Sequence, residues 1–120
     1  MRTLWIPILA IAALTPMCGA AADTYQQGMN LYGTVWSHLD QAQKHIAPYP
    51  GDWYRWDLAR GQMDLLERGW KAGSCDRAQV STAITDLQLI VDNNNLSSAD
   101  RKILRSDVEK LRDNQLKYCR

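Results

Sequence analysis

Two cysteines, Cys75 and Cys119, constrain the fold of this chain more than any other feature of its sequence. They lie at equal distances from Ser97, which separates two segments with the three- and four-residue apolar spacing of amphipathic helices. Residues equidistant from the tip of an antiparallel helical hairpin lie side by side, so a Cys75–Cys119 disulfide would seal the open end of that hairpin. An even pair of cysteines in an exported domain is typically a disulfide. In the chain-entropy model, closing a loop of this length stabilises a fold by about 4 kcal/mol.

The N-terminal segment, residues 1–22, predicts export. Arg2 supplies a positive charge, residues 4–14 form an apolar run, and the small residues Ala20 and Ala22 allow cleavage before Asp23. This is the layout of a secretory signal peptide, and the apolar run is too short to span a bilayer as a helix. Its removal leaves residues 23–120, enough for a single domain.

Two alternatives to a cleaved signal peptide follow from the same segment. A buried first helix of the fold is disfavoured by Pro7 and Pro16 and by the abrupt change to polar sequence at Asp23. Lipidation of Cys18 is a minor alternative, because Leu14 stands one position too early for the usual lipoprotein signal.

The predicted mature chain has no formal net charge, because loss of Arg2 from the 14 basic residues leaves 13 against 13 acidic ones. Affinity for nucleic acid depends on clustered Lys and Arg, and affinity for anionic lipid on a basic amphipathic segment, so neither partner is expected. We expect a periplasmic location in a bacterium, or secretion, without stable membrane insertion. In a eukaryotic source, Asn95-Leu96-Ser97 would be an N-glycosylation acceptor.

The first half of the mature chain predicts two helices. One runs from an N-cap at Asp23 to Pro48, and the other from an N-cap at Asp52 to Gly73, a residue that commonly closes helices. Their expected core stripes are Tyr25, Met29, Tyr32, Trp36, Leu39 and Ile46 on the first, and Trp56, Ala59, Met63, Leu66 and Trp70 on the second.

The second half of the mature chain predicts two more helices. The third helix is capped by Ser74 or Asp76 and ends in residues 92–95, whose Asp and Asn side chains favour turns, and the fourth is capped by Ser97. Their stripes are Val80, Ala83, Ile84, Leu87, Ile90 and Val91, then Leu104, Val108, Leu111 and Tyr118. The short connections predict an all-α, antiparallel, up-down-up-down four-helix bundle.

Catalytic and metal-binding patterns are weak. His38 and His45 share a helix face but lie about 10.5 Å apart along its axis, too far to ligate one metal ion, so we expect no metal site. Ser37, His38 and Asp40 point in different directions on a helix and cannot form a proton relay, so we expect no enzyme.

A cofactor is not expected either. Met29 stands where a haem-binding four-helix cytochrome has a methionine ligand, but residues 98–120 contain no His or Met, and no CxxCH motif is present. Carboxylates such as Asp64 and Glu67 are flanked by Arg68 and Lys71 at helical spacing, which is typical of a solvated, ion-paired face.

The stretch YPGDWYRW, residues 49–56, places four aromatic rings in eight residues of a chain without phenylalanine. It has three interpretations: a cap that seals the core, an exposed hot spot for a protein partner, or one wall of a small-ligand pocket between the first two helices. The candidate partner-binding residues are Tyr49, Trp53, Tyr54, Arg55 and Trp56.

Within this stretch, Trp53 and Trp56 are expected to lie together over the bundle end, with Tyr54 pointing away and Arg55 stacked on a ring. Gly33 and Gly61 each cost about 1 kcal/mol in a helix interior, which indicates close helix approach or contact with another group.

These patterns favour binding over catalysis. The sequence predicts an exported, non-catalytic helical protein that binds another exported protein, as an inhibitor, an immunity-type protein or an accessory subunit. One alternative is a periplasmic chaperone that exposes apolar surface under stress, and another is a small-ligand-binding bundle. The partner and the oligomeric state stay open.

Overall fold

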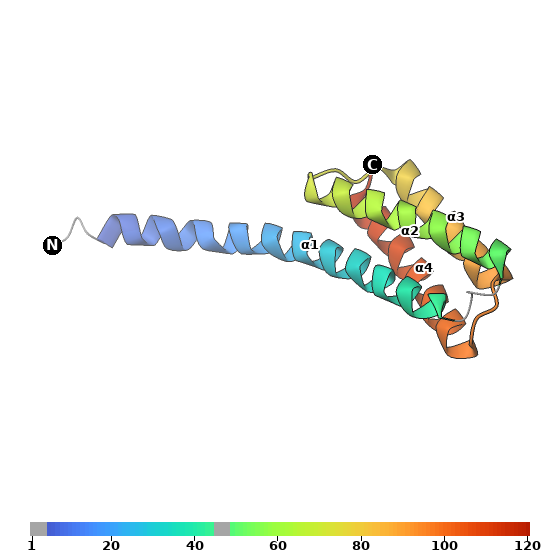
Figure 1. The fold of residues 1–120 in the computed structure, drawn as a ribbon. Coiled ribbons are helices and arrows are strands. Elements are labelled where there is room, and N and C mark those ends of the chain that lie inside the picture. The colour runs from blue at the N-terminus through green and yellow to red at the C-terminus, as the bar shows by residue number, and fades with distance from the viewer. Residues whose placement is uncertain (1–4, 45–48) are drawn as a thin grey trace.

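The computed structural model describes the backbone of residues 5–44 and 49–120, and side chains from residue 23 onward within those ranges. These residues form four α-helices and no strand: α1 (Trp5–Gln43), α2 (Pro50–Lys71), α3 (Arg77–Asn93) and α4 (Ser98–Tyr118). The predicted all-helical fold is therefore confirmed, and Figure 1 shows the four helices gathered into a bundle.

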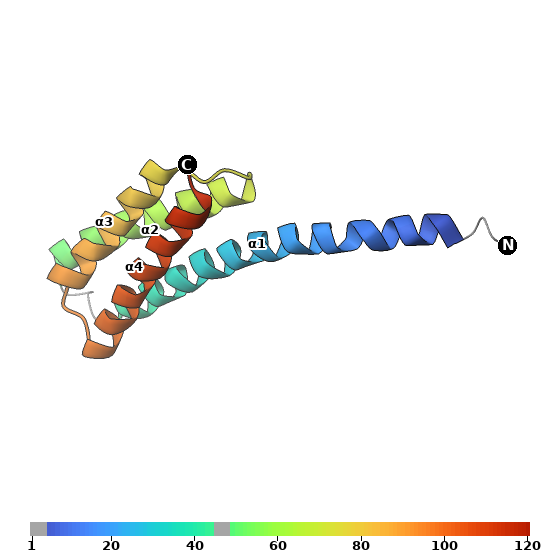
Figure 2. The same ribbon diagram turned by 180° about the vertical axis from the view of Figure 1, so that it is seen from behind.

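The helices meet as a four-membered ring. α1 packs against α2 and α4, and α3 packs against the same two helices, whereas the backbones of the diagonal pairs do not come close to each other within the described residues. The view from behind in Figure 2 shows that the N-terminal part of α1 projects beyond the other three helices. None of the described helices is both long and apolar enough to cross a bilayer.

The first helix begins earlier than the sequence predicted. α1 starts at Trp5 and continues through Asp23, so Asp23 is not its N-cap in the full chain. Pro7 and Pro16 lie within this helix and do not end it. Ala20, Ala21 and Ala22 are strong helix formers and no proline follows Pro16 in α1, so nothing stops the helix between Pro16 and the bundle. Cleavage before Asp23 stays a prediction. Two expectations for the end of this helix, Ile46 in the core stripe and Pro48 as terminator, lie outside the described residues.

The second helix also begins earlier than predicted. α2 starts at Pro50 with Tyr49 at the N-cap, so Asp52 lies inside the first turn. Proline suits the first helical position because its φ is fixed and its missing N–H has no partner to lose there. Gly73 closes the segment after α2 with φ +81°, as predicted.

The caps of the last two helices follow the sequence. Asp76, rather than Ser74, caps α3 by accepting a hydrogen bond from Ala78 N. Ser97 caps α4 by accepting from Asp100 N at 3.0 Å.

The predicted disulfide is present between Cys75 and Cys119, whose Cα atoms lie 4.6 Å apart. Two backbone hydrogen bonds hold the same chain ends together, from Arg120 N to Cys75 O at 3.1 Å and from Arg77 N to Arg120 O at 3.0 Å. The start of α3 and the end of α4 are thus joined covalently and by main-chain hydrogen bonds.

The core consists mainly of the predicted stripes, with two kinds of exception. Tyr25 and Tyr118, expected in the core, are exposed at 43% and 40%, and Met29, Trp36 and Trp70 are only half-buried. Five polar side chains are also buried: Asp52, Asn94, Asp100, Asp107 and Asn114. The buried apolar residues are Tyr32, Val35, Leu39, Ala42, Trp56, Ala59, Met63, Leu66, Val80, Ala83, Ile84, Leu87, Ile90, Val91, Leu104, Val108, Leu111 and Cys119.

Candidate functional site

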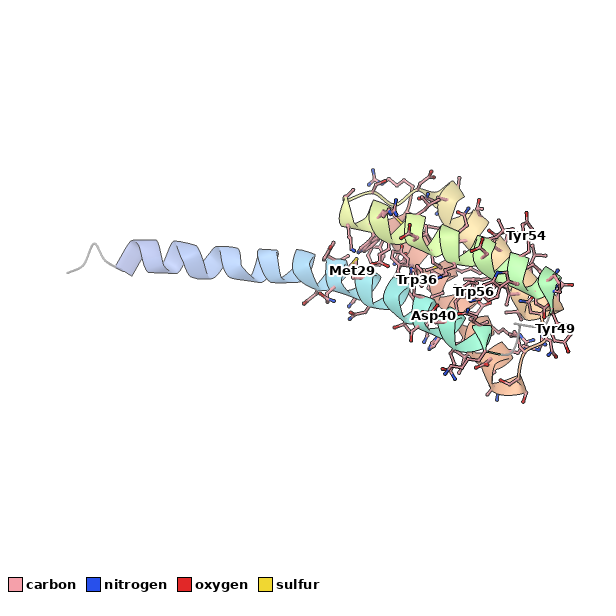
Figure 3. The ribbon with its side chains drawn as sticks, viewed as in Figure 1. Met29, Trp36, Asp40, Tyr49, Tyr54 and Trp56 are labelled. Atoms are coloured by element: carbon pink, nitrogen blue, oxygen red, sulfur yellow. A yellow bond between two sulfur atoms is a disulfide. The ribbon has the colours of Figure 1, made fainter. Side chains whose placement is uncertain are left out.

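The aromatic stretch 49–56 forms the start of α2 at one end of the bundle, and its rings divide between surface and core. Tyr49, Trp53 and Tyr54 are 47%, 41% and 64% exposed, whereas Trp56 is only 2% exposed. Figure 3 shows Tyr49 at the end of the bundle, Tyr54 on the outer side of α2, and Trp56 between α1 and α2. We call Tyr49, Trp53 and Tyr54 the exposed aromatic patch.

The two tryptophans of the stretch form one stack. Trp56 is fixed by a hydrogen bond from its Nε1 to Leu39 O on α1 at 2.7 Å. The Trp53 ring lies on it, with centroids 4.9 Å apart and planes at 28°. Trp56 thus seals the core and is covered, while a partner that approaches this end would meet Trp53.

Arg55 does not stack on a ring, contrary to expectation. Its Nη2 donates to Asp52 Oδ1 at 2.8 Å and its Nε donates to Asn94 Oδ1 at 2.7 Å. Asp52 Oδ2 accepts from Asn95 N at 2.7 Å, and Asn94 Nδ2 donates to Asp52 O at 3.0 Å. The early start of α2 places Asp52 where it binds the α3–α4 loop, and this network makes the base of the patch rigid.

The arginine that contacts aromatic rings is Arg60. Its Cζ lies 4.3 Å from the Trp36 ring centroid and 4.9 Å from that of Trp56. Its Nε also lies 3.8 Å from Asp40 Oδ1. Arg60 is one turn further along α2 than Trp56, a spacing that the sequence shows, but the ring it covers on α1 depends on tertiary packing.

A row of exposed apolar side chains continues from the patch along α2. Leu58 and Leu65 are 42% and 43% exposed and lie on the same helix face as Tyr54. This face is directly opposite the core stripe of α2. Sequence reasoning missed it, although the spacing of residues 54, 58 and 65 is helical.

The two glycines singled out from the sequence do not mark close helix approach. A Cβ added at Gly33 or Gly61 would meet nothing within 4 Å. Gly61 instead lines an open groove of about 320 Å³ between α1 and α2, with Trp36, Asp57, Arg60 and Asp64. The close approach is at Gly28, where an added Cβ would overlap the ring of Trp70.

Two polar pairs in the described part of the chain join α1 to α4. His38 Nδ1 lies 2.6 Å from Asp107 Oδ2, and Tyr32 OH donates to Asn114 Oδ1 at 2.7 Å. Burial raises the pKa of Tyr32 to about 12 and also raises the pKa of Asp107, although the bond to His38 lowers it in part. His45 lies outside the described residues.

Other polar patterns from the sequence are surface pairs. Asp64 accepts from Arg68 at 2.9 Å and Glu67 from Lys71 at 3.2 Å, all at i,i+4 spacing. The part of the chain that the structure describes contains no group of three or more His, Cys, Asp and Glu residues arranged to hold a metal ion.

Comparison with protein-family models, with curated proteins and with solved structures finds no match to this chain.

Proposed function

We propose that the protein is exported, cleaved before Asp23, and acts by binding another exported protein through the exposed aromatic patch and the adjoining outer face of α2. In this proposal it is an inhibitor, an immunity-type protein or an accessory subunit of an exported enzyme, and it performs no catalysis itself. Its location is the periplasm or the extracellular space, and neither nucleic acid nor membrane is its partner.

One observation carries the proposal: Tyr49, Trp53 and Tyr54 expose their rings on a rigid base. Trp53 rests on the buried Trp56, and the Asp52–Arg55–Asn94 hydrogen bonds fix the backbone beneath them. Trp and Tyr are among the side chains that most often dominate the binding energy of protein–protein interfaces, and an exposed cluster of them marks such a site. Because the base is already ordered, little conformational entropy is lost on binding.

We infer an up-down-up-down order for the bundle. Opposite directions of α1 and α2 are supported by two contacts, Trp56 with Leu39 and Trp70 with Tyr25. In this topology the α1–α2 connection, the start of α2 and the α3–α4 loop share one end of the bundle. The patch then has two loops beside it, which suits a convex surface that enters a partner's cleft.

The test is a double variant, Trp53→Ala with Tyr54→Ala. The tagged protein is used to isolate its partner from a native extract of the source, and the dissociation constant is then measured with both purified proteins. Two truncated hot-spot rings should weaken binding at least about 30-fold. The matched control, Leu89→Ala with Leu116→Ala, removes two exposed side chains from α3 and α4 and should bind like the natural protein.

Two results would contradict this assignment. If the Trp53/Tyr54 variant bound the same partner with an unchanged dissociation constant, the exposed aromatic patch would be excluded as the binding site. Equal weakening in both variants would indicate a general apolar surface, as expected of a chaperone. Circular dichroism and thermal melting verify that each variant is folded, since Trp53 also covers Trp56.

A further inference from the structure

A second aromatic cluster lies at the opposite end of α2, beside the disulfide. It surrounds a cavity of about 310 Å³ that opens to solvent. Trp70 is 17 residues beyond Trp53 on the same helix, so the two clusters are about 25 Å apart. The lining residues are Thr24, Tyr25, Trp70, Gly73, Ser74, Cys75 and Tyr118.

The central ring of this cavity, Trp70, is held in place from several sides. Its Nε1 donates to Tyr25 O at 2.8 Å, and its ring lies directly on the backbone of α1 at Gly28. The buried ring of Tyr32 meets it at 85°, with centroids 5.6 Å apart. The Trp70 indole therefore keeps one orientation without a ligand.

The Tyr118 ring stands nearly perpendicular to that of Trp70, with planes at 73° and centroids 5.9 Å apart. Tyr25 comes from α1 and is 43% exposed, and Tyr118 comes from the end of α4 and is 40% exposed. Aromatic rings from three helices thus line one cavity, two of them at almost a right angle. Such an arrangement lets one compact group touch more than one ring face.

The electrostatics of the cavity favour a cation. None of its lining side chains carries a charge, and the faces of aromatic rings are negative. α2 ends at Lys71 and α4 ends at Tyr118, so the negative ends of two helix dipoles lie here. α3 begins nearby, at Arg77, but the carboxylate of Asp76 caps that positive helix end.

Two lysines are sequence neighbours of the lining rings but are not part of the lining. Lys71 Nζ pairs with Glu67 Oε1 at 3.2 Å, and Lys117 precedes Tyr118 on α4. Side chains of successive helix residues point about 100° apart, so Lys71 and Lys117 point in different directions from the neighbouring rings that line the cavity.

We propose that this cavity binds a trimethylammonium group. A quaternary trimethylammonium group has no N–H to donate and is weakly hydrated, so aromatic faces and helix C-termini bind it better than they bind a lysine ammonium. The volume is at the small end of ligand sites, which suits a head group. This site is separate from the exposed aromatic patch and does not depend on the proposed protein partner.

The experiment uses the full chain with its disulfide intact and follows tryptophan fluorescence during titration with choline chloride. Parallel titrations use ammonium chloride at equal ionic strength and 3,3-dimethylbutanol, a neutral molecule of the same shape as choline. Choline should bind at least about tenfold more tightly than either, because only choline combines the charge with the methyl groups. Equal affinity for the neutral alcohol would overturn the proposal, as would the absence of a saturable response up to about 100 mM choline.

Variants locate the site. Tyr118→Phe keeps the ring and should keep choline binding, whereas Tyr118→Leu should weaken it about five- to tenfold. Leu116→Ala, which removes an exposed side chain from the same helix as Tyr118, is the matched control and should bind normally. Unchanged binding by Tyr118→Leu would overturn the assignment, and melting curves verify that it folds.

The same head group occurs in free molecules and in phosphatidylcholine. Cosedimentation with vesicles of phosphatidylcholine, compared with vesicles of phosphatidylglycerol, separates these sources. Choline-competed binding to phosphatidylcholine vesicles alone would identify a lipid head group as ligand, and binding to choline without binding to vesicles would identify a free one. Equal binding to both vesicle types, without competition by choline, would count against the site.

Discussion

The imidazole of His38 and the carboxylate of Asp107 join α1 to α4 across the bundle, with Nδ1 and Oδ2 2.6 Å apart. The carboxylate is 1% exposed and the imidazole 30%. The other oxygen of Asp107, Oδ1, is buried and has no hydrogen-bond partner among the described residues. His38 therefore makes the direct contact that compensates the buried charge of Asp107, and the charge of Lys110 also favours the ionised carboxylate.

His38→Ala should lower the free energy of unfolding by about 1–3 kcal/mol at pH 7, because it leaves the buried carboxylate of Asp107 without that partner. The loss should shrink as the pH falls toward 4. The pKa of Asp107 is raised above 3.8 in the fold by burial. The folded state thus binds the carboxyl proton of Asp107 more tightly than the unfolded state does. Protonation of Asp107 therefore stabilises the fold fully below pH 3.8, and this stabilisation is lost as the pH rises through the pKa of the folded state.

Urea denaturation at pH 4 and pH 7 measures this difference. His38→Ala with Asp107→Asn is the matched control, because it also removes the buried charge and should depend less on pH. A loss of the same size at both pH values in His38→Ala would contradict a role for His38 in compensating Asp107.

Trp70 and Gly28 provide a second test, because the indole ring lies directly on the α1 backbone at that glycine. Gly28→Ala should destabilise the fold by about 1–3 kcal/mol, since the new methyl group forces the ring from its place. Gly33→Ala is the control on the same helix and should stabilise by about 0.5–1 kcal/mol, because nothing lies within 4 Å of its added Cβ. Thermal melting and Trp fluorescence report both, and equal effects of the two variants would contradict the packing.

Local patterns predicted the second half of the chain well. Asp76 and Ser97 lie at N-caps, and the apolar stripes of α3 and α4 are all buried apart from Tyr118. These features depend on contacts within a few residues, which the sequence shows directly. The Cys75–Cys119 pair added the one long-range contact that could be predicted from residue type and spacing alone.

The features of the fold that the sequence did not predict depend on contacts between residues far apart in the chain. Asp52 has the side chain of an N-cap, but Pro50 starts the helix earlier and Asp52 binds Asn95 instead, 43 residues away. Asp107 and Asn114 interrupt the apolar stripe of α4, and this signal of buried polar pairs was present in the sequence. Their partners on α1, His38 and Tyr32, are set by how the helices pack.

The aromatic pocket was within reach of the sequence. Tyr118 is next to Cys119, and Trp70 is five residues before Cys75, so the disulfide itself brings the two rings near each other. Placing Tyr118 in the buried apolar stripe of the fourth helix hid this relationship.

Asp52 offers a third test of the fold, at the end of the bundle that carries the patch. Asp52→Ala should destabilise by about 1.5–3 kcal/mol, because Asn95 N and Arg55 lose charge-assisted hydrogen bonds in a site where Asp52 is 6% exposed. Asp64→Ala on the same helix removes only the exposed pair with Arg68 and should cost about 0.5 kcal/mol or less. Chemical denaturation of both variants measures the contrast, and similar losses would show that the network adds no more than a surface pair.

The disulfide should account for a large share of the stability of the bundle. A double variant, Cys75→Ala with Cys119→Ala, avoids a free thiol and should lower the free energy of unfolding by about 2–4 kcal/mol, because the unfolded chain regains the entropy of a loop spanning 44 positions. Domains of this size are stable by only about 5–15 kcal/mol in total. The native state itself should change little, since Arg120 N still bonds Cys75 O and Arg77 N bonds Arg120 O through the main chain.

Urea denaturation of the double variant, and of the natural protein with and without reductant, separates an effect of the disulfide on the unfolded state from an effect on the native state. A lower midpoint with unchanged near-ultraviolet circular dichroism fits a bond that acts on the unfolded state. Loss of the native spectrum would instead mean that the covalent link is needed to hold α3 against α4. Peptide mapping that finds the sulfur atoms of Cys75 and Cys119 free, or joined between molecules, would refute the pairing on which both expectations rest.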